Sequence, residues 1–369
     1  MSVPAYHNFA LKAAHEESAS TLLPSGESFI VLHDYPPPLV EMLWRQFLGR
    51  IDCPAHYDAP EFFLEPYWAQ KGPFAVLAID SGRVIGVLTG LHLKGSVESG
   101  VASRPQIRTD DAADAFLAAD LLAQGLLQEA GREKLIKVFS WNWLPLPAFE
   151  RREFLRCDLE GDVVLDLCMG ADALFKQFNE SRRRNIRIAI RNEIDVSEVT
   201  TPEDTQAYWR VYSTWRQTER KSIRHDQSFA TIEKIHSMRE NHRRFLARYK
   251  GQVIAATGLR FLSRGLVEYA NNCSLDEFMY LRPNDLLFWR TIQWACEHGF
   301  SKYCLGGAGP FHRRSGGTVV PICRYRLDRT FLRREDLKDK LLANARILRS
   351  EMGQRVRGLL GKIRHPKAS

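Results

Sequence analysis

The sequence lacks any long hydrophobic run. Nowhere in its 369 residues do about 18 uncharged apolar residues follow one another, which excludes an ordinary membrane-spanning helix. The first residues, MSVPAYHNFALKAAHEESAS, also lack the continuous apolar segment of a secretory signal. We therefore expect a cytoplasmic protein. Its basic C-terminal end further suggests a peripheral position at the inner face of the membrane.

Paired cysteines and the common catalytic motifs are missing as well. The seven cysteines are scattered and include no C-x-x-C pair, which favours reduced thiols over a zinc site or a disulfide framework. The chain has no GxxxxGKS or GxxxxGKT phosphate loop, no GxGxxG after a strand, no HExxH and no GxSxG. These absences argue against ATP hydrolysis, dinucleotide chemistry and serine hydrolysis, and we expect no metal.

The excess positive charge lies at one end of the chain. Of the net charge of +8, residues 333–369 contribute +7, from eleven Lys or Arg against four Asp or Glu. Leucines and other apolar residues recur there at spacings of three and four, which predicts a basic amphipathic helix. Two interpretations stay open: the helix packs on the preceding domain, or it docks on anionic lipid or RNA.

Two stretches of the chain repeat each other. Each has an apolar segment, a turn ending in glycine, a second apolar segment, a helix-like run and then E-x-G-x-x-K. Gly251 follows Gly82 by 169 residues, and Gly299 follows Gly131 by 168 residues, so the two stretches have nearly the same internal length. We infer that one ancestral unit occurs twice, although hairpin, helix and strand is also a common order in α/β proteins.

The order of expected elements predicts an α/β (α+β) protein in four parts. These parts are a polar leader at residues 1–28, a first unit at 29–160, a second unit at 161–332 and the basic tail at 333–369. In the second unit, helices precede a hairpin, a strand, a helix and a strand. That order predicts, for each unit, a mixed and mostly antiparallel sheet with helices on both faces.

The densest charge in the body of the chain is the run RRRNIRIAIR at 182–191. If this run is helical, Arg184, Arg187 and Arg191 share one stripe, with Ile186, Ala189 and Ile190 opposite. Guanidinium groups bind phosphate oxygens bidentately, so the stripe is a candidate substrate-binding element. The alternative is an ordinary solvated helix face.

A second candidate combines the strand YANNCS with the start of the helix that follows it. Asn272 lies on this strand, and Asp285 lies in the first turn of a helix that begins near Pro283. A strand end and the next helix N-terminus lie close together in such a unit, where backbone N–H groups can face a ligand. The alternative is that Asn284 or Asp285 only caps the helix.

A third candidate is the segment YCLGG with the loop AGPFHRRSGG after it. Gly306 and Gly307 permit close backbone approach to a substrate. His312 and Arg313 add a potential base and an anion ligand. Glycine turns of this kind also occur without any role in binding.

Taken together, these segments resemble the FemAB-like or BioF2-like branch of the GNAT acyltransferase superfamily. The resemblance covers residues 165–320 and rests on the elements RRNIRIA and PNDLLFWRTIQWACEHGFSKYCLGG. It implies two tandem GNAT-like domains. It also implies transfer of an acyl or aminoacyl group, from acyl-CoA or another acyl thioester or from aminoacyl-tRNA, to an amine of a cell-envelope, polysaccharide or lipid precursor.

Three departures from the family pattern bear on this expectation. Cys304 stands where relatives often have an acidic residue, the segment ICRYRLDRTF replaces the frequent F-K-x-x-F-G ending, and the coenzyme A loop R/Q-x-x-G-x-G/A is not evident. Amine attack on an activated carbonyl needs few special residues, and four candidates for accepting the proton are Asp285, Glu268, Tyr303 and His312. We expect the active site in the cleft between the two units. The alternative is a catalytically silent GNAT-like module that docks on anionic membrane or nucleic acid through its tail.

Overall fold

The computed structural model describes residues 26–338 and 341, apart from 69, 101–103, 111–114, 219–229, 231–233, 235–239 and 264. The leader up to residue 25, most of an expected helix at 228–241 and nearly all of the basic tail lie outside the described residues. None of the described helices is long and apolar enough to cross a bilayer.

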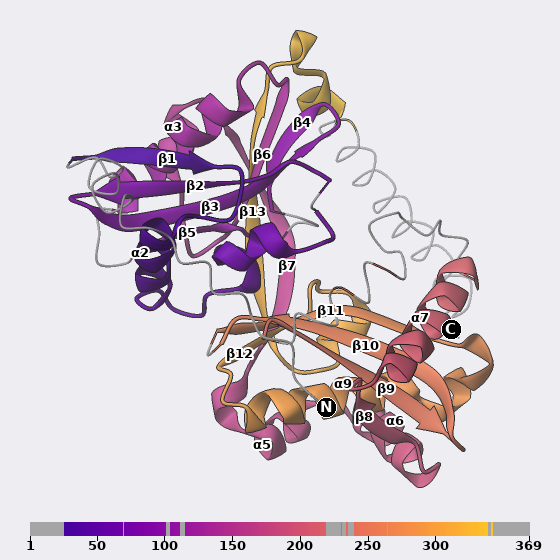
Figure 1. Ribbon diagram of the computed structural model, residues 1–369. Helices are drawn as coiled ribbons and strands as arrows, with labels where there is room; N and C mark the ends of the chain where they lie inside the picture. The colour runs from indigo at the N-terminus through magenta and orange to yellow at the C-terminus, as the bar shows by residue number, and fades with distance from the viewer. Residues whose placement is uncertain are drawn as a thin grey trace, which may run out of the picture.

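Within the described residues, one mixed sheet of 13 strands runs through both halves of the molecule (Figure 1). Its strand order is β1-β2-β3-β4-β6-β13-β7-β12-β11-β10-β9-β8, and β5 pairs with β3. The elements of the first half are β1 (Ser28–Leu32), α2 (Pro38–Leu48), η2 (His56–Asp58), η3 (Pro60–Leu64), β2 (Pro73–Asp80), β3 (Arg83–Leu93), β4 (Ser96–Ser99), β5 (Ile107–Thr109), α3 (Ala115–Ala130), β6 (Leu135–Trp141) and α4 (Pro147–Arg151).

The second half follows the long strand β7 (Leu155–Asp166). Its elements are η5 (Leu167–Met169), α5 (Ala171–Gln177), α6 (Glu180–Arg191), β8 (Asp195–Glu198), α7 (Pro202–Thr218), β9 (His242–Tyr249), β10 (Gln252–Phe261), β11 (Leu266–Ser274), η7 (Asp276–Leu281), α9 (Pro283–Glu297), β12 (Lys302–Cys304), α10 (Pro310–Arg313), β13 (Thr318–Asp328) and η8 (Phe331–Arg333).

The two halves repeat one arrangement, as the sequence predicts. Gly82 turns β2 into β3 and Gly251 turns β9 into β10, with φ of 74° and 81°. Gly131 and Gly299 follow α3 and α9 with φ of 49° and 72°. In each half the helix leads into a strand that runs parallel to the strand before it, β6 beside β4 and β12 beside β11. The duplication is therefore confirmed.

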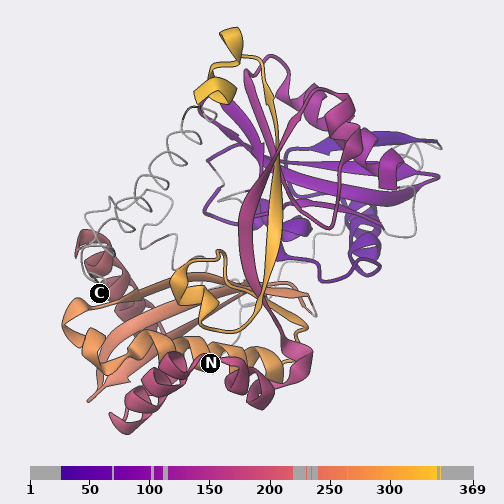
Figure 2. The same ribbon diagram turned by 180° about the vertical axis from the view of Figure 1, so that it is seen from behind.

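Two long strands exchange between the halves. β7 pairs with β12 of the second half, β13 pairs with β6 of the first half, and the two strands pair with each other (Figures 1 and 2). Gly161 lies against β13 so closely that a Cβ would be 2.0 Å from the Val320 oxygen. Because the expected boundary at residues 160 and 161 falls inside β7, the limits of the two domains stay a prediction.

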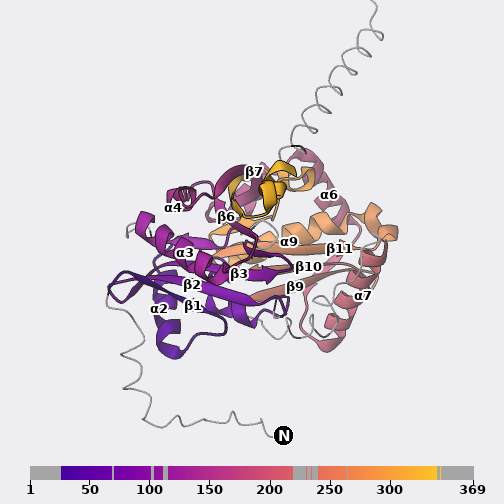
Figure 3. The same ribbon diagram turned by 90° about the horizontal axis from the view of Figure 1, so that it is seen from above.

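Helices cover both faces of each half. In the first half, the core residues of α3 and those of α2 pack against opposite faces of β2 and β3. In the second half, α6 and α9 share one core, while α7 packs on the other face of β10 and β11. Figure 3 shows α3 and α2 on either side of β1–β3 when the molecule is seen from above. A separate core between the halves joins the segment around η2 and η3 to β6, β12 and β13.

The last described residues are attached to the end of β13. The Asp336 backbone N–H donates to Asp328 Oδ2 at 3.0 Å, and Arg326 Nε donates to Asp336 Oδ1 at 2.6 Å. Asp336 is only 5% exposed. The start of the basic tail is thus fixed to the body of the protein.

Candidate active site

The parallel strands β11 and β12 separate after a short common stretch. They pair only where Leu266–Glu268 meet Lys302–Cys304. β11 then continues to Ser274, whereas the chain after Cys304 follows β7, with hydrogen bonds from Leu305 N to Val163 O at 2.9 Å and from Val163 N to Gly307 O at 3.1 Å. Beyond Glu268, this edge of β11 has no strand partner among the described strands.

β11 is also irregular at the place where β12 leaves it. Its register with β10 shifts between Gly258 and Leu259, which pair with Asn271 and Tyr269 and leave Ala270 as a bulge. Bulges bend a strand and are frequent next to active sites. The diverging strands therefore present backbone N–H and C=O groups that a ligand can pair with.

Glu268 belongs to the last pair before the strands diverge, and its side chain faces the first half of the molecule. Tyr57 Oη donates to Glu268 Oε2 at 2.7 Å, while Arg104 and Arg260 form ion pairs with Glu268 Oε1. Burial opposes ionisation of this carboxyl, but the two arginines and Tyr57 outweigh burial and lower its pKa. Glu268 is therefore ionised at neutral pH, and its role as proton acceptor stays a prediction.

Arg104 brings the first half into contact with the glycine pair of the second. A Cβ on Gly306, whose φ is 69°, would be 2.9 Å from Arg104 Nη2. Cys304 Sγ lies 3.5 Å from Asp162 Oδ2 on the same face of the sheet. Burial raises the pKa of the Cys304 thiol, so this residue is a neutral thiol and Asp162 supplies a carboxyl group beside it.

On the opposite face of the same strands, Arg182 is completely buried. Its guanidinium lies between the rings of Phe288 and Phe311, 4.2 Å from each ring centre, and Nη2 donates to the Phe311 oxygen. Nε and Nη1 have no hydrogen-bond partner, and Nε is 3.8 Å from Asp285 Oδ1. Burial lowers the pKa of Arg182 to about 10, which still leaves it charged at neutral pH.

Asp285 is held by α6 and does not cap its own helix. Its Oδ2 accepts a hydrogen bond from Asn185 Nδ2 at 2.9 Å, while Oδ1 has no hydrogen-bond partner. The residue before α9 is Arg282, in the left-handed conformation at φ 61° and without a side-chain cap. Asn284 Nδ2 bonds Ser274 Oγ at 3.0 Å. The capping interpretation is therefore wrong, because both side chains point to neighbouring elements.

Three buried oxygen atoms around the N-terminus of α9 have no hydrogen-bond partner. They are Asn272 Oδ1, Asn284 Oδ1 and Asp285 Oδ1. Buried polar atoms are nearly always paired, and exceptions often mark sites where a ligand or water binds. Asn272 thus shares with Asp285 and Arg182 a buried polar atom that has no hydrogen-bond partner among the described residues.

The other two expected proton acceptors are placed differently. The Tyr303 hydroxyl is 2.8 Å from Thr291 Oγ1 inside the core under α9, and its side chain lies on the face opposite to Glu268. His312 lies on α10, where a Cβ on Gly307 would be 3.3 Å from its Nδ1. Burial lowers the pKa of His312, which keeps the imidazole neutral.

The arginine stripe lies on the outer surface of α6. Arg184, Arg187 and Arg191 are exposed, and Arg191 lines a cavity of about 520 Å³ together with Arg248 and Lys250. Ile186 and Ala189 are buried as expected, but Ile190 is 49% exposed. The expectation that Ile190 shares the buried face was wrong, because that face is centred on positions 182, 185, 186 and 189.

Arg313 pairs with Glu160 at the surface, and its Nε donates to the Ala308 oxygen at 2.7 Å. Its side chain is half exposed at 49%. The structure brings neither Arg313 nor the stripe of Arg184, Arg187 and Arg191 into contact with Glu268 or Asp285. Their part in binding stays a prediction.

Sequence reasoning missed two arginines of this region. Arg182 is spaced three, four and seven residues from Asn185, Ile186 and Ala189, and this helical period places it on the buried face. That spacing could have identified it. Arg104 reaches Glu268 across 164 residues of chain, and no local pattern indicates this contact.

A known family model matches part of the second half of the chain. Residues 180–314 match the model of a family described as acetyltransferase (GNAT) domain. No protein with a curated description matches the sequence.

Solved structures agree with the whole fold. FemX is 12% identical, with a TM-score of 0.57 over 70% of this chain and 89% of its own. The C-terminal domain of a putative lysylphosphatidylglycerol synthetase from Agrobacterium fabrum is 14% identical, with a TM-score of 0.56. This match covers 82% of the present chain and 95% of the synthetase domain. A tandem GNAT protein from the clavulanic acid biosynthesis pathway is 10% identical, with a TM-score of 0.53. This match covers 83% of the present chain and 99% of the tandem GNAT protein. At these identities the likeness shows the fold, and it confirms the expected fold of two tandem GNAT-like units.

Proposed function

We propose that this chain, a FemAB-like protein with a GNAT acetyltransferase domain at residues 180–314, transfers an acyl group from an acyl thioester such as acyl-CoA to an amine. One observation carries the proposal. Glu268, an ionised carboxylate, occupies the last paired position before β11 and β12 diverge. A donor bound along the open edge of β11 would place its carbonyl next to this base.

The chemistry follows from this placement. The neutral amine attacks the thioester carbon, so that a C–N bond forms and the C–S bond then breaks, with the electron pair leaving on sulfur. Nitrogen becomes a strongly acidic ammonium once the C–N bond has formed, so even a carboxylate of low pKa can accept its proton. Glu268 takes that proton, and backbone N–H groups at the bulged edge of β11 hold the developing oxyanion.

Arg182 and Asp285 support the donor from the other face. Their partners come from α6, α9 and α10, so the pair fixes three elements around the open edge of β11. Arg184, Arg187 and Arg191 are proposed to contact phosphate groups of the donor or acceptor. Arg313, Gly306 and Gly307 shape the loop that follows β12.

The acceptor is proposed to be an amine of an envelope, polysaccharide or lipid precursor. The resemblance to the FemAB-like branch supports an envelope substrate, and the name of the putative lysylphosphatidylglycerol synthetase supports a lipid substrate. That name describes an aminoacylated lipid, which keeps aminoacyl-tRNA as a second donor class to be tested. A cytoplasmic location next to the membrane is consistent with either donor.

The test is an acyl-transfer assay on the full chain. Acetyl-CoA is supplied with a panel of amines, namely an amino sugar, lysine and an aminoacylated lipid, and release of the free thiol is followed. We expect thiol release that depends on the amine and is lost in Glu268→Gln. Transfer that occurs only from aminoacyl-tRNA would overturn the thioester donor.

The same assay addresses the alternative of a silent docking module. If no donor is turned over and the full chain sediments with anionic vesicles through residues 333–369, the docking module replaces the enzyme. Since the tail beyond residue 341 lies outside the described part of the chain, its docking stays a prediction.

A further inference from the structure

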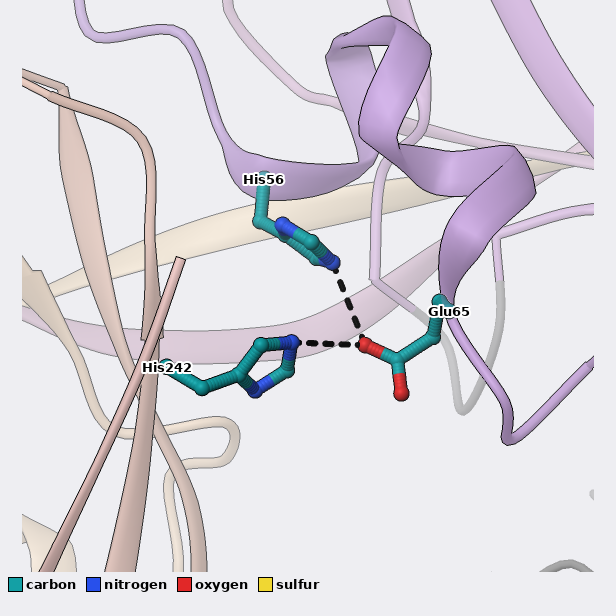
Figure 4. A group of neighbouring side chains, drawn as sticks. All are labelled: His56, Glu65 and His242. Carbon is teal, nitrogen blue, oxygen red and sulfur yellow. Dashed lines mark hydrogen bonds and ion pairs between the residues drawn. The ribbon is translucent and has the colours of Figure 1, made fainter. Parts of the chain in front are cut away.

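Three side chains that are far apart in the sequence converge between the two halves. His56 comes from η2, Glu65 follows η3, and His242 begins β9. All three are buried, with exposures of 1%, 0% and 6%. Figure 4 shows Glu65 between the two imidazole rings, with both rings turned toward the same carboxylate oxygen.

The separations of the three ligand-type atoms suit a small metal ion. Glu65 Oε2 lies 3.2 Å from His56 Nε2 and 2.9 Å from His242 Nε2, and all three atoms are within 4.8 Å of one another. Around tetrahedral zinc, with bonds of about 2.0–2.1 Å, neighbouring ligand atoms are about 3.3 Å apart. The two separations from Glu65 Oε2 are close to this value, and the two histidine nitrogens are at most 4.8 Å apart.

The hydrogen bonding of this group is incomplete. Among the described residues, His242 Nε2 lies close to Glu65 without a hydrogen bond to any acceptor, and His56 Nδ1 and Glu65 Oε1 have no hydrogen-bond partner. An unpaired buried polar atom costs about 1–3 kcal/mol, and an ion at the Glu65 carboxylate could be a partner for two of these atoms, His242 Nε2 and Glu65 Oε1.

We propose that His56, Glu65 and His242 bind a divalent transition metal of the zinc class. The ion joins the segment around η2 and η3 to β9, and therefore fixes the two halves that meet at Glu268. The sequence predicts no metal, because 9 residues separate His56 from Glu65 and 177 separate Glu65 from His242, so no spacing motif exists. The site is independent of the proposed acyl transfer.

The neighbouring arginine makes the proposal sharper. Arg260 Nε lies 3.6 Å from Glu65 Oε2. The Arg260 guanidinium also lies over the rings of Tyr67 and Trp68. This cation competes with a metal for the carboxylate. Replacing it by Met should tighten zinc binding by about tenfold, since a like charge near the ion is removed. A purely hydrogen-bonded group would show no such gain.

The experiment measures zinc on the full chain, purified without a histidine tag. Metal content and zinc titration against a competing chelator are compared for the wild type, His242→Ala, Glu65→Gln and Arg260→Met. His92→Ala is the matched control, because His92 Nε2 is 2.6 Å from Glu129 on the surface of the first half, with His33 on the same carboxylate. We expect one zinc per chain, an affinity reduced by about 100-fold in His242→Ala and Glu65→Gln, and no change in the control.

The outcomes separate the site from adventitious binding. An affinity that falls in His92→Ala and not in His242→Ala would place the ion at the surface and overturn the proposal, as would a wild type that retains no zinc. If His242→Ala does not fold, cobalt substitution of the wild type decides. The strong visible absorption of tetrahedral cobalt supports the site, and its absence overturns it. None of these readouts depends on catalytic activity.

Discussion

The two halves of the molecule place different residues at the same position of one fold. In the first half, the last parallel pair of β4 and β6 is Ser99 with Val138. In the second half, the corresponding pair of β11 and β12 is Glu268 with Cys304. A Cβ on Gly100, directly after β4, would lie 2.6 Å from the Phe139 side chain, so packing closes the first half where the second half opens.

The helices differ in the same sense. Subtracting the repeat length of 168 from Asp285 gives Leu117, which packs against the core of the first half. Asp285 instead keeps an oxygen without a partner beside the buried Arg182. The first half has an apolar side chain at this position, whereas the second half keeps a buried polar side chain with an unpaired oxygen. Proteins break packing rules in this way mainly at functional sites.

The largest expected effect is that of Glu268→Gln. This change removes the proton acceptor and should lower kcat by about 10²–10⁴. Glu98→Gln is the matched control, since Glu98 lies on β4 and pairs with Lys137. Steady-state thiol release measures both variants. Equal effects of the two changes would contradict the assignment of the site to the second half.

Arg182→Lys should come next. Lysine keeps the charge but lacks the planar group that lies between Phe288 and Phe311. Because α10 would then be misplaced, kcat/KM should fall by about 10–100-fold. The control is Arg151→Lys, because Arg151 lies 4.4 Å from the Phe116 ring on the exposed surface of the first half. Kinetics and thermal melting are both measured. A change in the melting temperature without a change in kcat/KM would show that Arg182 contributes only to packing.

The paired change Arg184→Ala with Arg187→Ala should weaken donor or acceptor binding by at least tenfold, about 1.4 kcal/mol. The thermal midpoint should move by no more than a few degrees, because both side chains are exposed. Arg83→Ala with Arg132→Ala, two exposed arginines of the first half, is the control. If the first pair behaves like the control, the stripe is a solvated helix face.

The smallest effect concerns the two hairpin turns. Gly82 and Gly251 both have positive φ and nothing within 4 Å of an added Cβ. Alanine at either position should cost about 1–2 kcal/mol of unfolding free energy, from backbone strain alone. Chemical denaturation of the two variants measures this cost. Clearly unequal losses would show that the two turns are not equivalent.

Sequence reasoning recovered the periodic features of this protein and missed those that depend on distant contacts. The repeat was visible because Gly82, Gly131, Gly251 and Gly299 require positive φ, a property of single residues. The exchange of β7 and β13 was not visible, because strand pairing leaves no mark on the local pattern. For the same reason, no spacing identified Arg104 beside Glu268 or His242 beside Glu65.

The central claim is that the donor binds between β11 and β12. A crystal structure with a non-hydrolysable acyl-CoA analogue tests it most directly. We predict the acyl carbonyl beside the unpaired edge of β11 at residues 269–272, within reach of Glu268. Binding along β4 next to Ser99, or no binding to either half, would contradict the account.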